Sequence, residues 1–391
     1  MSTIGKEKEL SLPPNVRLLG AVSLLNDIAS EAIFPLLPQF LITVLGGNRF
    51  HLGLIEGFAD SVASLLKLWA GATSDRAGRR RIFVVLGYSL TVVVRPLIGL
   101  VNAPWQLFGA RIADRIGKGL RTAPRDALIA DSSPPEIRGR AFGFHRAMDH
   151  LGAAIGPLIA MTFLLIWPDH LRTLFLLTLL PGLLVVALLL FGLKEKRSSP
   201  SNGAVPGLGL KSFSGRFRLY LTAMAVFTLG NSSDAFLLVR AGELGVPTAL
   251  LPLLWSAFHV VKSLGNLLAG RLADRVSPRP LILTGWLIYS VIYLAFAMIT
   301  TAWQAWLLFL LYAIFYSLTE PAEKKLVTHL VSEDQKGAAF GWFNFAIGIA
   351  ALPSSVLFGW LYEQFGQLIA FGWGAGLALI AAGILSVFRV E

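Results

Sequence analysis

The sequence predicts an all-α membrane protein with twelve transmembrane helices, arranged as two parallel six-helix bundles. Three observations support this fold class: the apolar composition, the recurrence of long apolar runs, and a motif repeat between the two halves of the chain. Of the 391 residues, 55% are hydrophobic and 15% are charged, and the mean hydropathy is +0.66. Soluble domains carry about 25% charged residues, so this composition is typical of a chain that lies mostly in lipid.

Apolar runs separated by Gly, Pro and charged residues define the expected helices. A helix needs about 20 apolar residues to cross a bilayer, whereas a transmembrane barrel would show alternating segments of about ten residues. The expected spans are 16–44, 52–74, 82–101, 105–131, 139–166, 171–193, 217–241, 248–271, 280–300, 304–331, 337–361 and 367–388.

The segment KEKRSSPSNGAVPGLGLKSFSGR at 194–216 separates the sixth span from the seventh. It is basic and rich in Ser, Gly and Pro, which is typical of a flexible tether. We therefore expect one six-helix bundle over 1–193, a cytoplasmic linker over 194–216, and a second bundle over 217–391.

The distribution of Lys and Arg among the loops predicts the orientation. The loops after the even-numbered spans are basic, as in the run 79–81, whereas the opposite loops hold little beyond Arg49, Arg172 and Arg240. Positively charged loops stay in the cytoplasm, so a multi-pass protein of the cytoplasmic (inner) membrane with both termini inside is expected. The net charge of +11 is then a topology signal, and no nucleic-acid partner is expected.

Several function classes are excluded by what the sequence lacks. Cysteine is absent, so disulfides, thiolate catalysis and cysteine metal sites are excluded. There is no phosphate-binding G-x-x-x-x-G-K-[ST] loop and no HExxH or GxSxG motif. Residues 1–15 are polar and lead into a span too long for a signal peptide. We therefore expect no enzyme, no cofactor, no metal site and no cleaved leader.

Short motifs repeat between the two halves. Residues 71–76 (GATSDR) match 270–275 (GRLADR), and residues 138–144 (RGRAFGF) match 336–342 (KGAAFGW). Because each half has an even number of spans, the halves share one orientation. The expected result is a pseudo-twofold axis along the membrane normal, with a central cavity between the halves.

These motifs resemble those of the major facilitator superfamily of transporters, over essentially the whole chain. GATSDRAGRRR (71–81) is similar to the loop signature G-x-x-x-D-R-x-G-R-R, and GRLADRVSPRP (270–280) is a degraded second copy with Ser277 in place of glycine. RIGKGLRTA (115–123) resembles the helix-4 arginine motif of proton-linked members, although Lys118 and Arg121 depart from it. GAAIGPLIA (152–160) is similar to part of a helix-5 motif of antiporters.

The resemblance implies a secondary active transporter that works by alternating access, coupled to protons and directed to efflux by antiport. The expected partners are a small-molecule substrate, protons and the lipid bilayer, and the chain is expected to be a monomer. Arg76 is expected to pair with Asp131 in a lock that holds one conformation and breaks in the other. The residues expected in this conformational lock are Gly71, Asp75, Arg76, Gly78, Asp131, Asp274 and Arg275.

The fourth expected span carries an unusual stripe of charge. At 100° per residue, Arg111, Arg115, Lys118, Thr122 and Arg125 fall within about 80°, bordered by Arg121. Each charge facing the centre of the bilayer costs at least about 2.5–3.5 kcal/mol, so the stripe must face water or partner charges. Two interpretations stay open: the cations of the stripe bind substrate or couple transport, or they form static pairs with Asp114, Asp126 and the first helix.

Carboxylates on other spans are the candidates for coupling. Asp27 and Glu31 lie one turn apart on the first span, where an approaching arginine could drive release of a proton. The further candidates for substrate binding or coupling are Asp60, Asp149, His150, Asp234 and Glu320.

The charge asymmetry between the halves predicts the class of substrate. The counterparts of Arg121 and Arg125 in the tenth span are Leu318 and Ala322, so the cationic wall belongs to the first half. Arginine forks bind carboxylates and phosphates, which favours an organic acid, a phosphate ester or an anionic metal chelate. The alternative is an exporter of cationic drugs or divalent metal ions by proton antiport, with oxygen and imidazole ligands from Asp27, Glu31, Asp149, His150 and Glu320.

Overall fold

The computed structural model describes residues 11–134, 138–195, 210–331 and 336–387. Every regular element in these ranges is helical, so the all-α prediction is confirmed. Eight helical stretches of the described chain are long and apolar enough to cross a membrane: Pro14–Val44, Arg80–Leu100, Phe144–Ile166, Leu171–Gly192, Gly215–Glu243, Pro278–Met298, Ala302–His329 and Ala339–Ser386.

The first half follows the six expected spans, with a broken first pass. Its elements are α1 (Pro14–Ile33), η1 (Phe34–Leu36), α2 (Leu37–Gln39), η2 (Phe40–Val44), α3 (Arg49–Ala77), α4 (Arg80–Leu97), η3 (Ile98–Leu100), α5 (Pro104–Ser132), α6 (Arg138–Ile166), α7 (Leu171–Leu177) and α8 (Leu179–Gly192). Pro35 and Pro38 cause the change from α-helix to 3₁₀ turn and back, because proline cannot donate the helical hydrogen bond.

The second half also follows its expected spans, and its first pass is broken between α9 and α10. Its elements are η5 (Leu210–Ser212), α9 (Gly215–Gly230), α10 (Ala235–Glu243), η6 (Thr248–Leu250), α11 (Leu251–Arg275), α12 (Pro278–Met298), α13 (Ala302–His329) and α14 (Lys336–Ser386). At Gly366 the backbone of α14 turns into the left-handed region (φ 78°), where glycine meets no steric penalty. This bend divides α14 into the last two expected passes.

The charge of α5 is turned away from lipid. Arg111, Asp114 and Arg121 are buried, whereas Trp105 on the same helix is 72% exposed. Burying charge against protein rather than hydrocarbon is how a membrane helix accommodates ionised side chains. This explains why so polar a helix can take a place between apolar neighbours.

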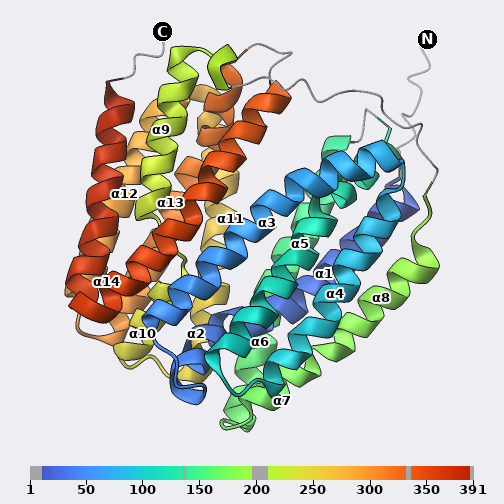
Figure 1. Cartoon of the computed structure of the whole chain (residues 1–391), viewed down its shortest axis with the longest axis horizontal. Coiled ribbons are helices and arrows are strands. Elements are labelled where there is room, and N and C mark those ends of the chain that lie inside the picture. The colour runs from blue at the N-terminus through green and yellow to red at the C-terminus, as the bar shows by residue number, and fades with distance from the viewer. Residues whose placement is uncertain (1–10, 135–137, 196–209, 332–335, 388–391) are drawn as a thin grey trace, which may run out of the picture.

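The helices form two groups that converge at one end of the molecule (Figure 1). The groups approach each other beside α2 and α10 and diverge towards the end where α1 begins and α14 finishes. The most extensive contacts between them are those of α3 with α14 and of α6 with α11. Small residues allow the close approach: a Cβ added to Gly57 would lie 2.9 Å from the Leu352 carbonyl oxygen, and Ser61 donates a hydrogen bond of 2.7 Å to the Gly348 carbonyl.

Candidate functional site

A polar cavity of about 830 Å³ lies between the two groups of helices. Helices α1 and α3–α6 supply one wall, and α11, α13 and α14 supply the other. Eight Lys or Arg side chains line it against six Asp or Glu side chains, so cations are in excess. The charged and imidazole residues of the lining are Asp27, Glu31, Lys67, Arg95, Lys118, Arg121, Arg125, Asp126, Arg146, Asp149, His150, His259, Lys262, Glu320, Glu323 and Lys324.

The predicted stripe on α5 divides between different environments. Lys118, Thr122 and Arg125 line the large cavity, as does the bordering Arg121. Arg111 does not: its guanidinium forms a 2.8 Å ion pair with Glu56, and both side chains are buried. The start of the stripe therefore meets a partner charge on α3, whereas its later turns face the cavity.

A chain of buried polar contacts links Arg111 to the first helix. Arg111 lies 3.7 Å from Asp114, which forms a 2.9 Å ion pair with Arg95. Arg95 also donates to the carbonyl of Asn26 at 3.0 Å and to its side-chain oxygen at 2.9 Å. The Asn26 amide in turn donates to Asp27 at 2.8 Å. These groups satisfy one another, so they form a static framework that holds α1, α4 and α5 together.

Arg121 and Arg125 have partners within the first half. The Arg121 guanidinium lies 4.3 Å from the centre of the Tyr88 ring and donates to Thr91 at 3.2 Å. Arg125 forms a 2.9 Å ion pair with the neighbouring Asp126. Both cations are therefore oriented by α4 and α5.

Lys118 differs from these arginines. It is exposed to the cavity, and within the described chain it has neither an ion pair nor a hydrogen bond through its ammonium group. An unpaired ammonium group in a protein-lined cavity is available to an anionic ligand.

The carboxylates predicted for coupling face the same cavity. Glu31 accepts a 2.8 Å hydrogen bond from the Trp255 indole, which connects α1 to α11 across the two groups of helices. Asp149 accepts a hydrogen bond from Ser23 and lies 3.5 Å from the Nδ1 atom of His145. Asp27 and His150 are also part of the lining.

The opposite wall carries several charges, of which the sequence singled out only Glu320 as a candidate site residue. Lys262 forms a 2.7 Å ion pair with Glu320 and lies 3.9 Å from the centre of the Tyr316 ring. Glu323 and Lys324 add to the same wall. These charges are visible in the sequence because they interrupt apolar spans. The sequence alone does not show which way each side chain points.

A second, smaller chamber of about 240 Å³ contains the remaining predicted residues. Arg115, Asp60 and Asp234 line it together with hydroxyl side chains of the second half. Asp234 accepts hydrogen bonds from Tyr312 at 2.8 Å and from Tyr316 at 3.2 Å. The structure therefore separates the twelve predicted binding or coupling residues into the large cavity, the small chamber and the buried Arg111.

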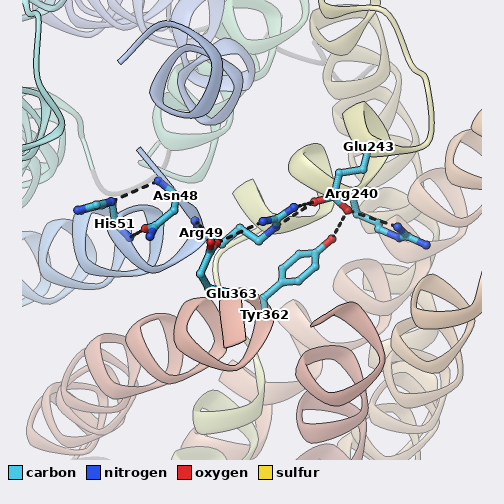
Figure 2. A network of polar contacts seen from close by, with 7 residues as sticks. All are labelled: Asn48, Arg49, His51, Arg240, Glu243, Tyr362 and Glu363. Atoms are coloured by element: carbon cyan, nitrogen blue, oxygen red, sulfur yellow. Dashed lines mark hydrogen bonds and ion pairs between the residues drawn. The ribbon is translucent and has the colours of Figure 1, made fainter. Parts of the chain in front are cut away.

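Ion pairs connect the two halves at the end where they converge (Figure 2). Arg49, at the start of α3, pairs with Glu243 at 2.5 Å and with Glu363 at 3.2 Å. Tyr362 donates to Glu243 at 2.6 Å, and Arg240 pairs with the same carboxylate at 3.3 Å. Because these residues come from α3, α10 and α14, the network closes this end across the interface.

The residues of the predicted conformational lock are only partly described. Asp131, near the end of α5, forms an ion pair with Arg80, the first residue of α4. Gly78 follows α3 with φ +59°, a conformation that glycine adopts readily, and Gly71 lies against Ala123 of α5. The side chains of Asp75, Arg76, Asp274 and Arg275 lie outside the described residues, so the expected pair between Arg76 and Asp131 stays a prediction.

No group of three or more His, Asp or Glu side chains in the described ranges is arranged to hold a metal ion. The five ligands considered for a divalent metal all line the large cavity, yet they are spread over its walls.

Comparison with known proteins gives a consistent result. The family model described as Major Facilitator Superfamily matches residues 19–258 and 219–391. An uncharacterized MFS-type transporter of Methanocaldococcus jannaschii is 35% identical over 395 residues, covering 98% of this chain and 96% of that protein. The multidrug resistance protein MdtH of Yersinia pestis is 26% identical over 370 residues, covering 90% of this chain and 89% of that protein.

Solved structures share the fold. The crystal structure of a bacterial homolog to the human lysosomal transporter Spinster, in an inward-facing and occupied conformation, superimposes with a TM-score of 0.74. The two sequences are 17% identical, and the alignment covers 95% of each chain. The similarity supports the predicted arrangement of two six-helix bundles.

Proposed function

Because this chain belongs to the major facilitator superfamily of transporters, we propose that it is a secondary active transporter that exports a small anionic solute in exchange for protons. The family and fold are typically non-enzymatic, so the cavity is interpreted as a passage and not as a reaction centre. The cavity between α5 and α13 is then the substrate site, in a multi-pass protein of the cytoplasmic membrane.

The environment of Lys118 is the observation on which the proposal of an anionic substrate depends. Its ammonium group faces the large cavity without a partner in the described chain, beside the guanidinium groups of Arg121 and Arg125. A ligand carboxylate or phosphate would gain a charge-assisted hydrogen bond from Lys118. The excess of cationic over acidic side chains in the lining also supports a negatively charged substrate.

Alternating access follows from the two ends of the cavity. The ion-pair network around Arg49 closes the end near α2 and α10, whereas the groups of helices diverge at the end that holds the basic loops (Figure 1). With the basic loops in the cytoplasm, this conformation is inward-facing. Transport would then open the Arg49 network while the lock around Asp131 engages at the other end.

Proton coupling is proposed for Asp27 and Glu31. Both line the cavity, and Glu31 is tied to α11 through Trp255, so its surroundings must change when the halves move. The resemblance to MdtH, a multidrug resistance protein, and the partial antiporter motif at 152–160 support export in exchange for protons.

A ligand screen followed by transport tests the proposal. Thermal stabilisation of the purified protein is measured with organic acids, phosphate esters, anionic metal chelates and cationic drugs over a range of pH. The best ligand is then used in proteoliposomes with an imposed proton gradient. We expect an anion to stabilise the protein and to be moved against its gradient. Stabilisation by cationic drugs alone would contradict the anionic assignment and favour the alternative below.

The decisive variant is Lys118→Gln. Removing one charge-assisted hydrogen bond costs about 1.5–3 kcal/mol, so the affinity for the anion should fall about 10- to 100-fold. The matched control is Lys211→Gln, because Lys211 is exposed in η5 and does not line the cavity. Equal transport by Lys118→Gln and the wild type would overturn the assignment.

Export of cationic drugs is the second candidate function. The specific observations in its favour are the MdtH relative and the six carboxylates of the lining. Export of a divalent metal has less support, since no group of ligands in the described residues is arranged to hold one. Loss of drug efflux in Asp27→Asn, with anion binding absent in the wild type, would establish this alternative.

A further inference from the structure

The small chamber continues the large cavity towards the closed end. On three helices the residue that lines the chamber lies about one turn from the residue that lines the cavity. These pairs are Phe34 and Glu31, Arg115 and Lys118, and Tyr316 and Glu320. Ile347 of α14 lines both spaces. The chamber is therefore the deep end of the proposed passage, just above the network around Arg49.

Both broken passes meet at this chamber. The first pass changes to a 3₁₀ turn at Phe34–Leu36, and Phe34 lines the chamber. The seventh pass is interrupted between α9 and α10, and all four residues of the interruption, 231–234, line it as well. In membrane transporters, interrupted helices at corresponding positions of two repeats are a strong indication of a substrate site.

The chamber contains polar groups that the described protein leaves without partners. Arg115 is only 9% exposed, and its Nε atom has no hydrogen-bond partner. The side-chain oxygen of Asn231 is also buried and unpaired. Asp60 is exposed to the chamber and forms no ion pair within the described chain. An unsatisfied buried polar group costs about 1–3 kcal/mol, so a ligand that meets these groups would be bound strongly.

The chamber groups without a hydrogen-bond partner would bind ligand groups of opposite charge. Arg115 requires an acceptor, and Lys118 requires another one turn away. Asp60, Asp234 and the Asn231 oxygen require donors. Asp234 is already oriented by Tyr312 and Tyr316, and a carboxylate with about four acceptor positions can accept further hydrogen bonds.

From this arrangement we propose that the substrate is a small anion that also carries an ammonium group. The ammonium group binds in the chamber between Asp60 and Asp234, and the acidic group extends past Arg115 towards Lys118 in the large cavity. This inference rests on the proposed function and adds a second charged group, the ammonium group, to the proposed substrate. Asp60 and Asn231 are then the residues that select for the amino group.

The volume of the chamber sets the size of the group that it accepts. A volume of about 240 Å³ is roughly eight times the share of one water molecule in the liquid. An aminoalkyl group fits such a space. The chamber therefore has room for the amino end of a compact amino-substituted acid.

Matched pairs of probes test the inference in the wild-type protein. L-aspartate is compared with succinate, and O-phosphoethanolamine with ethyl phosphate, by thermal stabilisation and by counterflow in proteoliposomes. The two members of each pair carry a comparable acidic group and differ in the amino group. We expect the amino member of at least one pair to bind about tenfold or more tightly, because it gains charge-assisted hydrogen bonds. If no amino member binds better than its partner, the inference is overturned.

The variant Asp60→Asn assigns the effect to the chamber. It should weaken binding of the amino member about tenfold and leave binding of the unsubstituted acid unchanged, whereas Asp169→Asn in the loop before α7 should leave both unchanged. If Asp60 carries only the transported proton, both members lose gradient-driven accumulation equally while their affinities stay the same, and the inference fails. Preferential binding of succinate or ethyl phosphate in the wild type would likewise refute it while leaving the anionic assignment intact.

Discussion

The two halves repeat the same motifs, yet their interiors are built from different chemistry. In the first half, buried ion pairs such as Arg95 with Asp114 hold neighbouring helices together. In the second half, aromatic rings pack in the interior: Phe227 stacks on Trp286 at 4.7 Å, and Tyr289 on Tyr293 at 4.1 Å.

This difference means that charged side chains line the cavity from the first half, whereas aromatic packing stabilises the second half. A fixed array of charges positions the cationic face of the first half. The aromatic half contributes Asp234, which accepts hydrogen bonds from tyrosine hydroxyls, and the ion pair between Lys262 and Glu320.

If the halves rock against each other, the buried ion pairs of Arg95 and Arg111 can stay intact because both partners belong to the first half. The contact between Glu31 and Trp255 joins the two halves and would change.

Breaking one buried ion pair should have the largest effect. Within the described chain, Arg95→Gln leaves Asp114 with the more distant Arg111, at 3.7 Å, as its remaining ion pair. Removing one partner of a buried pair destabilises a protein by about 3–5 kcal/mol, which is measured as the loss of free energy of unfolding in detergent. The double variant Arg95→Met with Asp114→Leu should recover most of that loss, because it leaves no orphaned charge. Equal losses in the single and double variants would show that the charges are not what holds these helices.

The aromatic half should respond less to a comparable change. Phe227 contacts the rings of Trp286, Tyr289 and Phe315, and each such pair contributes about 0.5–1.5 kcal/mol beyond buried area. Phe227→Leu keeps an apolar side chain and should cost about 1–3 kcal/mol in the same unfolding measurement. A loss as large as that of Arg95→Gln would remove the distinction between the two interiors.

The sequence was sufficient for the fold because lipid imposes simple rules. Long apolar runs between Gly, Pro and charged residues locate helices by length alone, and the expected passes were all found. The change of helix type at Pro35 and the interruption between α9 and α10 lie inside expected spans. Such local changes depend on packing between helices, which a single sequence does not display.

The site was predictable only in part, for a geometrical reason. Periodicity placed Arg111 and Lys118 on one face of α5. That face runs along the length of the helix, and different helices pack against its two ends. Glu56 of α3 meets Arg111, whereas Lys118 faces the cavity. Of the charged residues of α11 and α13, the sequence indicated only Glu320 as a candidate, since a sequence gives the faces of single helices and not their rotation about each other.

The peripheral network at Arg49 should matter for conformation more than for stability. Its side chains are 25–31% exposed, and exposed ion pairs contribute about 0.2–1 kcal/mol each. Arg49→Gln should therefore shift the balance between the two conformations about threefold to tenfold towards opening at this end.

The absence of cysteine makes that shift directly measurable. The chamber residue Ser232 is replaced in Ser232→Cys, and a membrane-impermeant maleimide is added from the side of the Arg49 network. Labelling should be faster when Arg49→Gln is also present. The control is Arg172→Gln at the same end, since Arg172 donates only to carbonyls of its own half. Unchanged labelling in Arg49→Gln would mean that this network does not close the passage.

Replacing Lys118 should have the smallest effect on stability. Together with Arg111 it allows a comparison of two cations on the same helix. Lys118→Gln removes an exposed charge without a partner in the described chain, so the free energy of unfolding should change by no more than about 0.5 kcal/mol. Arg111→Gln is the same chemical change two turns away, but it orphans the buried Glu56 and should cost about 3–5 kcal/mol. Both are measured by unfolding in detergent without ligand. If Lys118→Gln proves as damaging as Arg111→Gln, the ammonium group supports the fold, and the case for an anion at this position loses its main observation.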